Sequence, residues 1–147
     1  MDFLTRRVPA TFTQNLTRIV LGAFMTGAGA THLTVARDAF RAQVPSWVPL
    51  DADLVVLGSG AVEVGLGLAL LSLPRHRRLT GVALAAFYVA IFPGNIAQYV
   101  DGVSAFGLDT DTKRLVRLAF QPVLVAAALY AAGLPERARR TDRGSST

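Results

Sequence analysis

Apolar residues in this chain gather in four long blocks, and charged residues lie mainly at the edges of those blocks. The blocks run over about residues 16–33, 52–73, 79–100 and 115–134. Each approaches or exceeds the roughly 20 mostly apolar residues that a helix needs to cross a bilayer. Because lipid offers no water to unpaired backbone groups, each block should be helical. The pattern therefore predicts an all-α fold, a bundle of four transmembrane helices.

Composition supports a membrane protein of one domain. Of the 147 residues, 52% are hydrophobic and only 17% are charged, whereas soluble domains carry about a quarter charged residues. We expect an N-terminal segment over 1–15, a four-helix membrane domain over 16–134 and a flexible basic tail over 135–147. The chain has no cysteine, which excludes disulfides, iron–sulfur clusters and cysteine-ligated zinc.

Basic residues outside the blocks predict the orientation. Nine arginines fall in the N-terminal segment, the second connection and the C-terminal tail, while the other two connections hold four basic residues. The positive-inside rule makes the side with nine cytoplasmic, so both termini are expected there, in a multi-pass protein of a bacterial plasma membrane. Arg18 and the run Arg75–Arg78 are expected to be interfacial anchors. The net charge of +5 then reflects these flanks, and no nucleic-acid partner is predicted.

Polar side chains inside the blocks are costly in lipid and are therefore informative. Glu63 lies roughly eleven residues into its block, or about 16 Å at 1.5 Å per residue, which is near the middle of the membrane. The other polar side chains fall in the outer halves of their blocks: His32, Asn95, Gln98, Arg117 and Gln121. Since all four blocks contribute at similar depth, we predict a polar cluster that opens toward the outer face.

Each of these residues has a candidate role. Glu63 and His32 are the candidate general acid and base, although Glu63 is also placed to pair with Arg117 or to hydrogen-bond between helices. Ser59 shares a helix face with Glu63 at i, i+4. The ligand-binding candidates are Arg117, Asn95, Gln121, Ser59, Gln98 and Trp47. For Asn95 and Gln121, the alternative is a purely structural role as hydrogen-bonding groups between helices.

The connection between the first two blocks carries two prolines and a tryptophan. Pro45 and Pro49 favour an extended turn, and Trp47 suits the headgroup level of a membrane. The segment 44–49 is predicted to lie over the polar cluster as a lid, or to act only as an anchoring loop.

Metal binding is not predicted. His32 and His76 fall near opposite surfaces, and His32 with Glu63 gives two ligands where three or four are usual. We therefore expect no metal and no intrinsic cofactor; a bound quinone is the cofactor considered.

Several segments together resemble the DoxX-like family of small bacterial integral membrane proteins. The segments are Gly29-Ala30-Thr31-His32, Val44–Pro49, Ser59-Gly60 with Glu63, Phe92-Pro93-Gly94-Asn95-Ile96, and Arg117-Leu118 with Gln121. The resemblance covers about residues 18–134 and implies a four-helix membrane bundle. The family is named after a component of a thiosulfate:quinone oxidoreductase, but most members have no assigned reaction. It therefore supports the fold more than the chemistry.

Two classes of function follow from these observations. In the first, the cluster binds a lipophilic small molecule with a polar head, such as a quinone or isoprenoid. The protein is then a membrane-embedded acid–base enzyme or a quinone-linked oxidoreductase component. In the second, the chain is a non-catalytic accessory or scaffold subunit of a larger membrane complex, or a homo-oligomer, and the buried polar groups only lock the bundle. A proton-coupled transporter is less favoured, because the chain has one deep acid and no visible inverted repeat.

Overall fold

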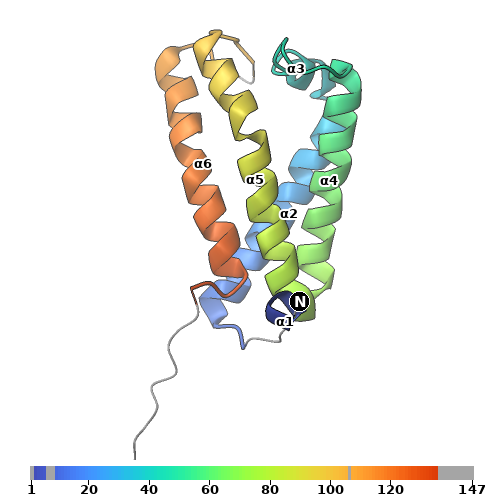
Figure 1. Cartoon of the computed structure of the whole chain (residues 1–147), viewed down its shortest axis with the longest axis vertical. Helices are drawn as coiled ribbons and strands as arrows, with labels where there is room; N and C mark the ends of the chain where they lie inside the picture. The colour runs from blue at the N-terminus through green and yellow to red at the C-terminus, as the bar shows by residue number, and fades with distance from the viewer. Residues whose placement is uncertain (1, 6–8, 106, 136–147) are drawn as a thin grey trace, which may run out of the picture.

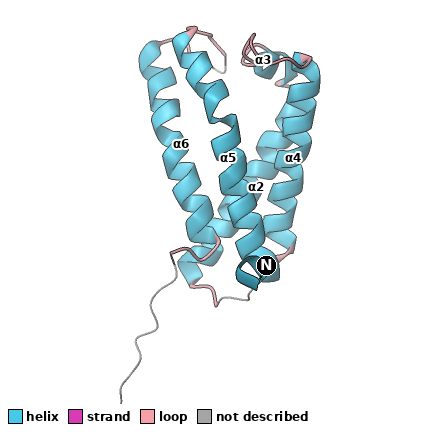
Figure 2. Cartoon of the chain, in the orientation of Figure 1, coloured by secondary structure: helices cyan, strands magenta, loops and turns pink. Residues whose placement is uncertain are grey.

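A computed structural model describes residues 2–5, 9–105 and 107–135, and all the regular structure in those ranges is helical (Figure 2). Residues 136–147 of the predicted tail, and Arg6 and Arg7 of the N-terminal segment, lie outside the described residues. The elements in chain order are α1 (Asp2–Thr5), α2 (Phe12–Leu33), α3 (Arg37–Arg41), α4 (Ala52–Ser72), the 3₁₀ turn η1 (Pro74–His76), α5 (Arg77–Val100) and α6 (Asp111–Ala131).

Four long helices form a bundle made of two pairs (Figure 1). α2 packs mainly against α4 and α5 mainly against α6, with further contacts between α2 and α6 and between α4 and α5. The short helix α3 lies at one end of the bundle and α1 at the opposite end, as Figure 1 shows. The all-α fold is therefore confirmed for the described residues.

Hydropathy located the four long helices, and the start of α4 at Ala52, but it missed the first turns of α2 and α6. α2 begins at Phe12, before the apolar block, because Thr11 and Gln14 form a capping box that stabilises a polar first turn. α6 begins at Asp111 behind a Thr110 cap. Apolar length reports the part of a helix that lipid can cover, whereas capping decides where the helix starts.

Among the described residues, three helical stretches are long and apolar enough to cross a membrane: Ala52–Ser72, Pro74–Val100 and Asp111–Ala131. α2 is not among them. Arg18, His32 and several threonines and glycines lower its apolar character.

Glycines bring α2 and α4 into backbone contact. A Cβ added to Gly29 would lie 2.6 Å from the carbonyl oxygen of Gly60, and one added to Gly22 would lie 3.0 Å from that of Gly67. Small residues at such crossings let two helix backbones approach closely. The apolar core lies where the two pairs meet, and it is formed by Leu21, Met25, Leu70, Leu84, Ala85, Tyr88, Ala128 and Ala131.

Three of the four arginines predicted to be interfacial anchors are buried within the protein. Arg18, Arg77 and Arg78 are buried, with 6%, 5% and 1% of their surface exposed. Only Arg75 among these arginines is exposed. A hydropathy profile treats a guanidinium only as a charge at the edge of a block. It contains no information about the backbone carbonyls and side-chain amides that can accept hydrogen bonds from that guanidinium.

Candidate functional site

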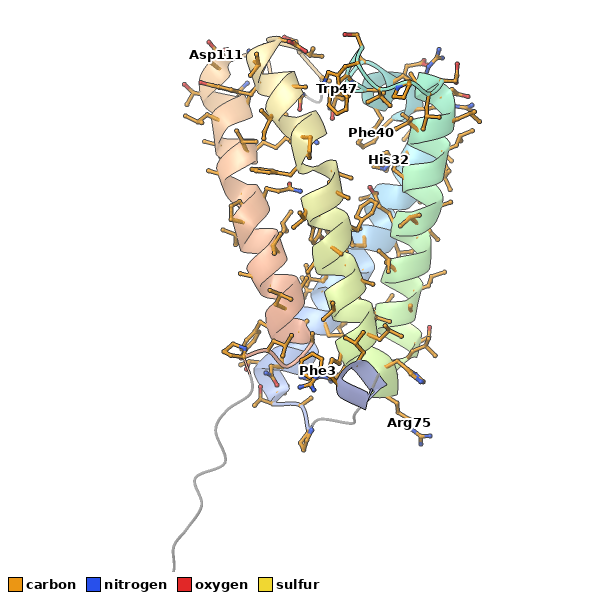
Figure 3. The ribbon with its side chains drawn as sticks, viewed as in Figure 1. Phe3, His32, Phe40, Trp47, Arg75 and Asp111 are labelled. Carbon is orange, nitrogen blue, oxygen red and sulfur yellow. The ribbon has the colours of Figure 1, made fainter. Side chains whose placement is uncertain are left out.

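A cavity of about 290 Å³ lies between the two helix pairs, at the end of the bundle that carries α3. Six of the eight predicted site residues line it: His32, Ser59, Glu63, Asn95, Arg117 and Trp47. Figure 3 places His32, Phe40 and Trp47 together at this end of the bundle. The predicted polar cluster is therefore present for these residues, and Trp47 and its neighbours in the 44–49 segment form part of its lining.

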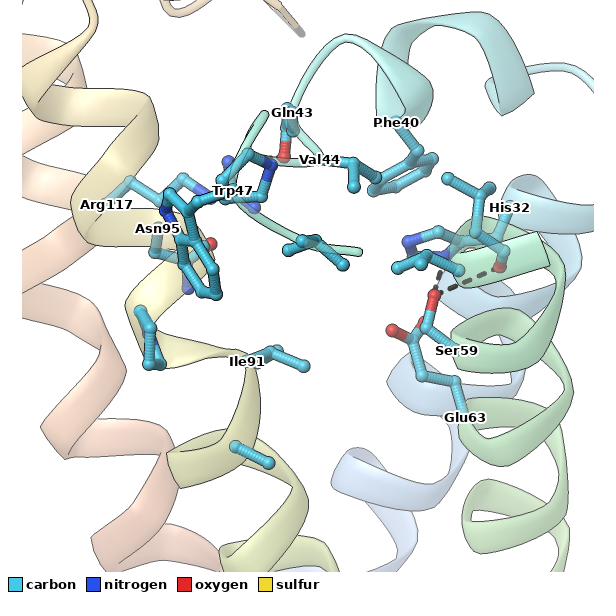
Figure 4. A pocket seen from close by; sticks show the side chains of 17 residues that line it. His32, Phe40, Gln43, Val44, Trp47, Ser59, Glu63, Ile91, Asn95 and Arg117 are labelled. Carbon is cyan, nitrogen blue, oxygen red and sulfur yellow. Dashed lines mark hydrogen bonds and ion pairs between the residues drawn. The ribbon is translucent and has the colours of Figure 1, made fainter. Parts of the chain in front are cut away.

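His32 and Glu63 form a buried pair on one wall of the cavity, as Figure 4 shows. His32 Nδ1 lies 3.0 Å from Glu63 Oε2, with 9% and 8% of the two side chains exposed. The same nitrogen lies 3.0 Å from the carbonyl oxygen of Ala28. Because a carbonyl only accepts, Nδ1 carries a proton that it donates to Ala28, which leaves Nε2 as the basic nitrogen of the neutral ring.

One oxygen of Glu63 keeps unused acceptor capacity. Oε2 is buried and receives no hydrogen bond of good geometry in the described part of the chain, although His32 Nδ1 is close. The two observations agree, because the N–H of His32 is directed along its own helix toward Ala28. A buried acceptor without a partner carries a desolvation cost of about 1–3 kcal/mol, which a donor on a bound molecule would remove.

The short helix α3 holds an aromatic ring against His32. Phe40 stacks on the imidazole, with ring centroids 3.2 Å apart and an angle of 24° between the ring planes. α3 is fixed in turn to α4, because Arg37 Nε donates to Asp53 Oδ1 at 2.6 Å. The hydrogen bond to Asp53 raises the pKa of Arg37 above its ordinary value, so this guanidinium stays charged throughout the usable pH range. Phe40 thereby restricts the orientation of the His32 ring.

Arg117 and Asn95 stand on the opposite wall, which α5 and α6 provide (Figure 4). Arg117 donates to the side-chain oxygens of Gln98 and, at 3.0 Å, Gln43. Asn95 Nδ2 donates to Gln121 Oε1 at 3.0 Å. These bonds fix the positions of the two donors that face the cavity.

Gln98 and Gln121, the other two predicted ligand-binding residues, do not line the cavity. Gln98 supports Arg117. Gln121 is buried behind Asn95, and its Nε2 donates to the carbonyl of Tyr88 at 2.8 Å. The structure therefore places both glutamines as supports for residues of the cavity wall and outside the lining itself.

The predicted alternative that Glu63 pairs with Arg117 is wrong. Glu63 is paired with His32, whereas Arg117 binds two glutamines. Depth along a helix gave both residues a compatible height, but it gave no direction around the helix axis. α4 packs on α2 and α6 packs on α5, so the cavity separates the two side chains.

Sequence reasoning missed Gln43, which lines the cavity from the loop after α3. Its Oε1 accepts from Arg117, and because a guanidinium only donates, this contact fixes the amide orientation. Nε2 is then a buried donor without a partner among the described residues. Gln43 lies outside the apolar blocks, so the depth argument did not apply to it.

The described residues hold no group of three or more His, Cys, Asp or Glu side chains that could bind a metal ion. His76 lies in η1, which joins α4 to α5 at the end of the bundle opposite the cavity. It is thus remote from His32.

Comparison with known proteins identifies a family and no function. No curated protein and no solved structure matches the chain. One family model, described as a domain of unknown function (DUF8561), matches residues 21–132. The matched region contains all the residues that line the cavity. The chain therefore belongs to the DUF8561 family.

Proposed function

We propose that the chain is a four-span protein of a bacterial plasma membrane whose cavity binds a lipophilic small molecule with a polar head, such as a quinone or isoprenoid. Both termini are cytoplasmic in this proposal, and the cavity faces the outer leaflet. α2 is proposed as the fourth span, because it packs closely along α4.

The outer surface of the bundle supports a lipid environment. Large apolar side chains are exposed on all four long helices, among them Phe24, Leu54, Val89 and Phe120, each with more than half of its surface exposed. Exposed apolar surface on this scale is typical of contact with membrane or protein. The three helical stretches that are long and apolar enough to cross a membrane agree with this environment.

The observation that carries the ligand proposal is the pairing of two unlike polar walls around one cavity. One wall offers the acid–base couple of His32 and Glu63, and the other offers the donors Arg117 and Asn95. Between them, apolar side chains such as Val56 and Ile91 complete the lining. Ligand sites are typically mostly apolar with a few converging polar groups, and about 290 Å³ suits a polar ring or head rather than a long chain.

This arrangement supports proton transfer at the ligand. His32 Nε2 is placed to accept a proton, and the nearby Glu63 carboxylate then stabilises the imidazolium. Arg117 and Asn95 are placed to hold a developing negative charge on a ligand oxygen. An isomerisation or ring opening of a membrane substrate fits these groups, as does proton exchange with a bound quinone.

The resemblance to DoxX-like proteins agrees with this proposal. Eleven of the residues that carry it line the cavity, among them His32, Glu63, Asn95 and Arg117.

The test compares bound molecules in purified wild type, Glu63→Gln and His32→Ala by native mass spectrometry and lipid extraction. Asp38→Asn and His76→Ala are the matched controls, because both positions are exposed and lie outside the cavity lining. We expect a lipophilic molecule to co-purify with wild type and controls, and its occupancy to fall about tenfold or more in the two site variants with the fold intact.

The second candidate function is a scaffold subunit. Its support is that the side chains of Gln98 and Gln121 form hydrogen bonds that join α5 to α6. If the site variants lose only stability and never a ligand, the scaffold function stands and the binding proposal is wrong.

A further inference from the structure

Three guanidinium groups are buried at the end of the bundle opposite the cavity. They belong to Arg18 on α2 and to Arg77 and Arg78 on α5. Arg77 lies close enough to the other two for their charges to repel its own. Gathering like charges away from water is unfavourable unless an anion or several hydrogen bonds compensate.

Arg18 and Arg78 each have partners. Arg18 donates to Asn15 Oδ1 at 3.0 Å and to the carbonyls of Leu70 and Leu71 near the end of α4. Those carbonyls form the negative end of the α4 dipole, where a cation is favourable. Arg78 donates to the carbonyl of Phe3 at 3.1 Å and lies 4.3 Å from the centre of its ring.

Arg77 is different, because most of its donors are unused. Its Nη2 donates to Gln14 Oε1 at 3.1 Å, an oxygen that also accepts the backbone N–H of Thr11. Its Nε and Nη1 are buried and have no hydrogen-bond partner in the described ranges, and 5% of the residue is exposed. Each orphan donor of a charged group costs more than a neutral one would.

The N-terminal end of α5 lies at the same place. This 24-residue helix begins at Arg77 with no side-chain cap on His76 and no acidic residue in its first turn. Helix N-termini carry partial positive charge and attract anions. Because side chains lean toward the N-terminus of their own helix, the unused donors of Arg77 and the end of α5 act on the same region.

We propose that this end of the bundle binds a phosphate-type anion, held by Arg77 at the N-terminus of α5 and supported by the charges of Arg18 and Arg78. A phosphate group supplies the negative charge and the several acceptor oxygens that Arg77 lacks. The Nε and Nη1 of Arg77 are buried in the free bundle, so in this proposal anion binding opens the hydrogen bond between Arg77 and Gln14. The expected anion is the phosphate of a phospholipid headgroup. α4 and α5 are long and apolar enough to cross a membrane, so their ends would lie at the level of the headgroups.

The proposal does not depend on the cavity or its ligand. The choice of source alone rests on the proposed membrane location, and because headgroups line both faces of a bilayer, it holds for either orientation.

The test measures lipid adducts by native mass spectrometry and the thermal unfolding midpoint of the full chain in detergent. Wild type, Arg77→Gln and Arg75→Gln are compared with added phosphatidylglycerol, phosphatidylcholine or inorganic phosphate. Arg75→Gln is the matched control, because it removes the same charge from an exposed position two residues away. We expect phosphatidylglycerol to bind wild type and Arg75→Gln alike, and to bind Arg77→Gln at least about tenfold more weakly.

A second readout separates the site from general stability. Without added anion, Arg77→Gln should be at least as stable as wild type, because it removes an unsatisfied buried charge. If inorganic phosphate gives the same Arg77-dependent shift as the lipid, the anion site stands and its source is soluble phosphate. If Arg77→Gln keeps full lipid binding, or if no phosphate-bearing compound binds wild type, the proposal is wrong.

Discussion

The two helix pairs of the bundle are held together by different means. α2 and α4 meet backbone to backbone through Gly29 and Gly60, whereas α5 and α6 are joined near the cavity by the amide pair Asn95 and Gln121. Glycine contacts fix the separation of two helices closely, because nothing flexible lies between them. An amide bridge holds helices farther apart and is adjustable by side-chain torsions.

This difference matches what each pair contributes to the cavity. The closely packed pair carries His32 and Glu63, whose relative position would govern the proposed proton transfer. The amide-bridged pair carries Arg117 and Asn95, which in the proposed function need only point donors at a ligand oxygen. The loop after α3 links the two pairs, since its Gln43 accepts from Arg117.

The largest expected effect breaks the glycine contact. Gly29→Ala places a methyl group 2.6 Å from the carbonyl oxygen of Gly60 and 2.8 Å from the backbone nitrogen of Val64. Neither backbone atom can move without moving α4, so we expect a loss of about 3 kcal/mol in unfolding free energy, and also a loss of bound ligand. Unfolding in detergent, followed by circular dichroism, measures it.

Gly58→Ala is the control for this substitution. Gly58 lies on the same helix as Gly60, but nothing stands within 4 Å of its added Cβ, so stability should be unchanged or should rise by up to about 1 kcal/mol. Equal losses at both positions would show that the close contact between α2 and α4 does not hold the pair.

A smaller effect tests the amide bridge. Asn95→Leu leaves Gln121 Oε1 buried without a donor, and Gln121→Leu also frees the carbonyl of Tyr88. We expect each variant to lose about 1–2 kcal/mol. The double variant should lose less than the sum, since the first substitution already breaks the shared bond. Additive losses would mean that the bond between Asn95 and Gln121 contributes nothing to the pair.

The sequence predicted the fold better than the pairing of side chains within it. Apolar length and polar depth were enough to place His32, Glu63, Asn95 and Arg117 at one level, and all four line one cavity. They did not decide which of them meet, because helix neighbours depend on packing between distant segments. The close approach of α2 and α4 is one such case, because it needs Gly22 and Gly29 on α2 to lie against Gly67 and Gly60 on α4.

Residues outside the apolar blocks were the hardest to predict. Gln43 and Phe40 reach the cavity only because α3 folds back over it. The five residues of α3 are too few for the hydrophobic periodicity from which a helix is predicted. Arg77 was predicted to be an interfacial anchor because it lies at the edge of an apolar block, where a basic side chain normally reaches water. Only tertiary packing shows that it does not.

A still smaller effect tests the link between the two pairs. Gln43→Glu keeps an oxygen for Arg117 but replaces the buried donor Nε2 with an acceptor. We expect stability to stay near that of wild type and ligand occupancy to fall about five- to tenfold. Gln43→Met removes both groups and should lower stability as well, because Arg117 loses a partner. Unchanged ligand binding in Gln43→Glu would exclude Gln43 from the binding site.

The smallest effect compares the ion pairs of the two helix pairs at the end of the bundle that carries α3. Asp109 accepts from Lys113 Nζ at 2.6 Å in the connection before α6, and this bond lowers the pKa of Asp109. Because the pKa of this carboxyl is lower in the folded state, the ionised carboxylate stabilises the fold at pH values above about 4, the ordinary carboxyl pKa. That contribution is lost as the pH falls through the folded-state pKa. Because both side chains are exposed, salt screens the pair, and Asp109→Asn should leave the unfolding midpoint at pH 7 almost unchanged. Arg37→Met removes the hydrogen-bonded ion pair that holds α3 to Asp53 and leaves only the longer contact of Arg41 with the same carboxylate, at 3.9 Å. It should therefore lower the midpoint and the ligand occupancy together. If Asp109→Asn lowered the midpoint more than Arg37→Met, this prediction would be wrong. The connection between α5 and α6 would then stabilise this end of the bundle more than the α3 segment, which holds Phe40 on His32.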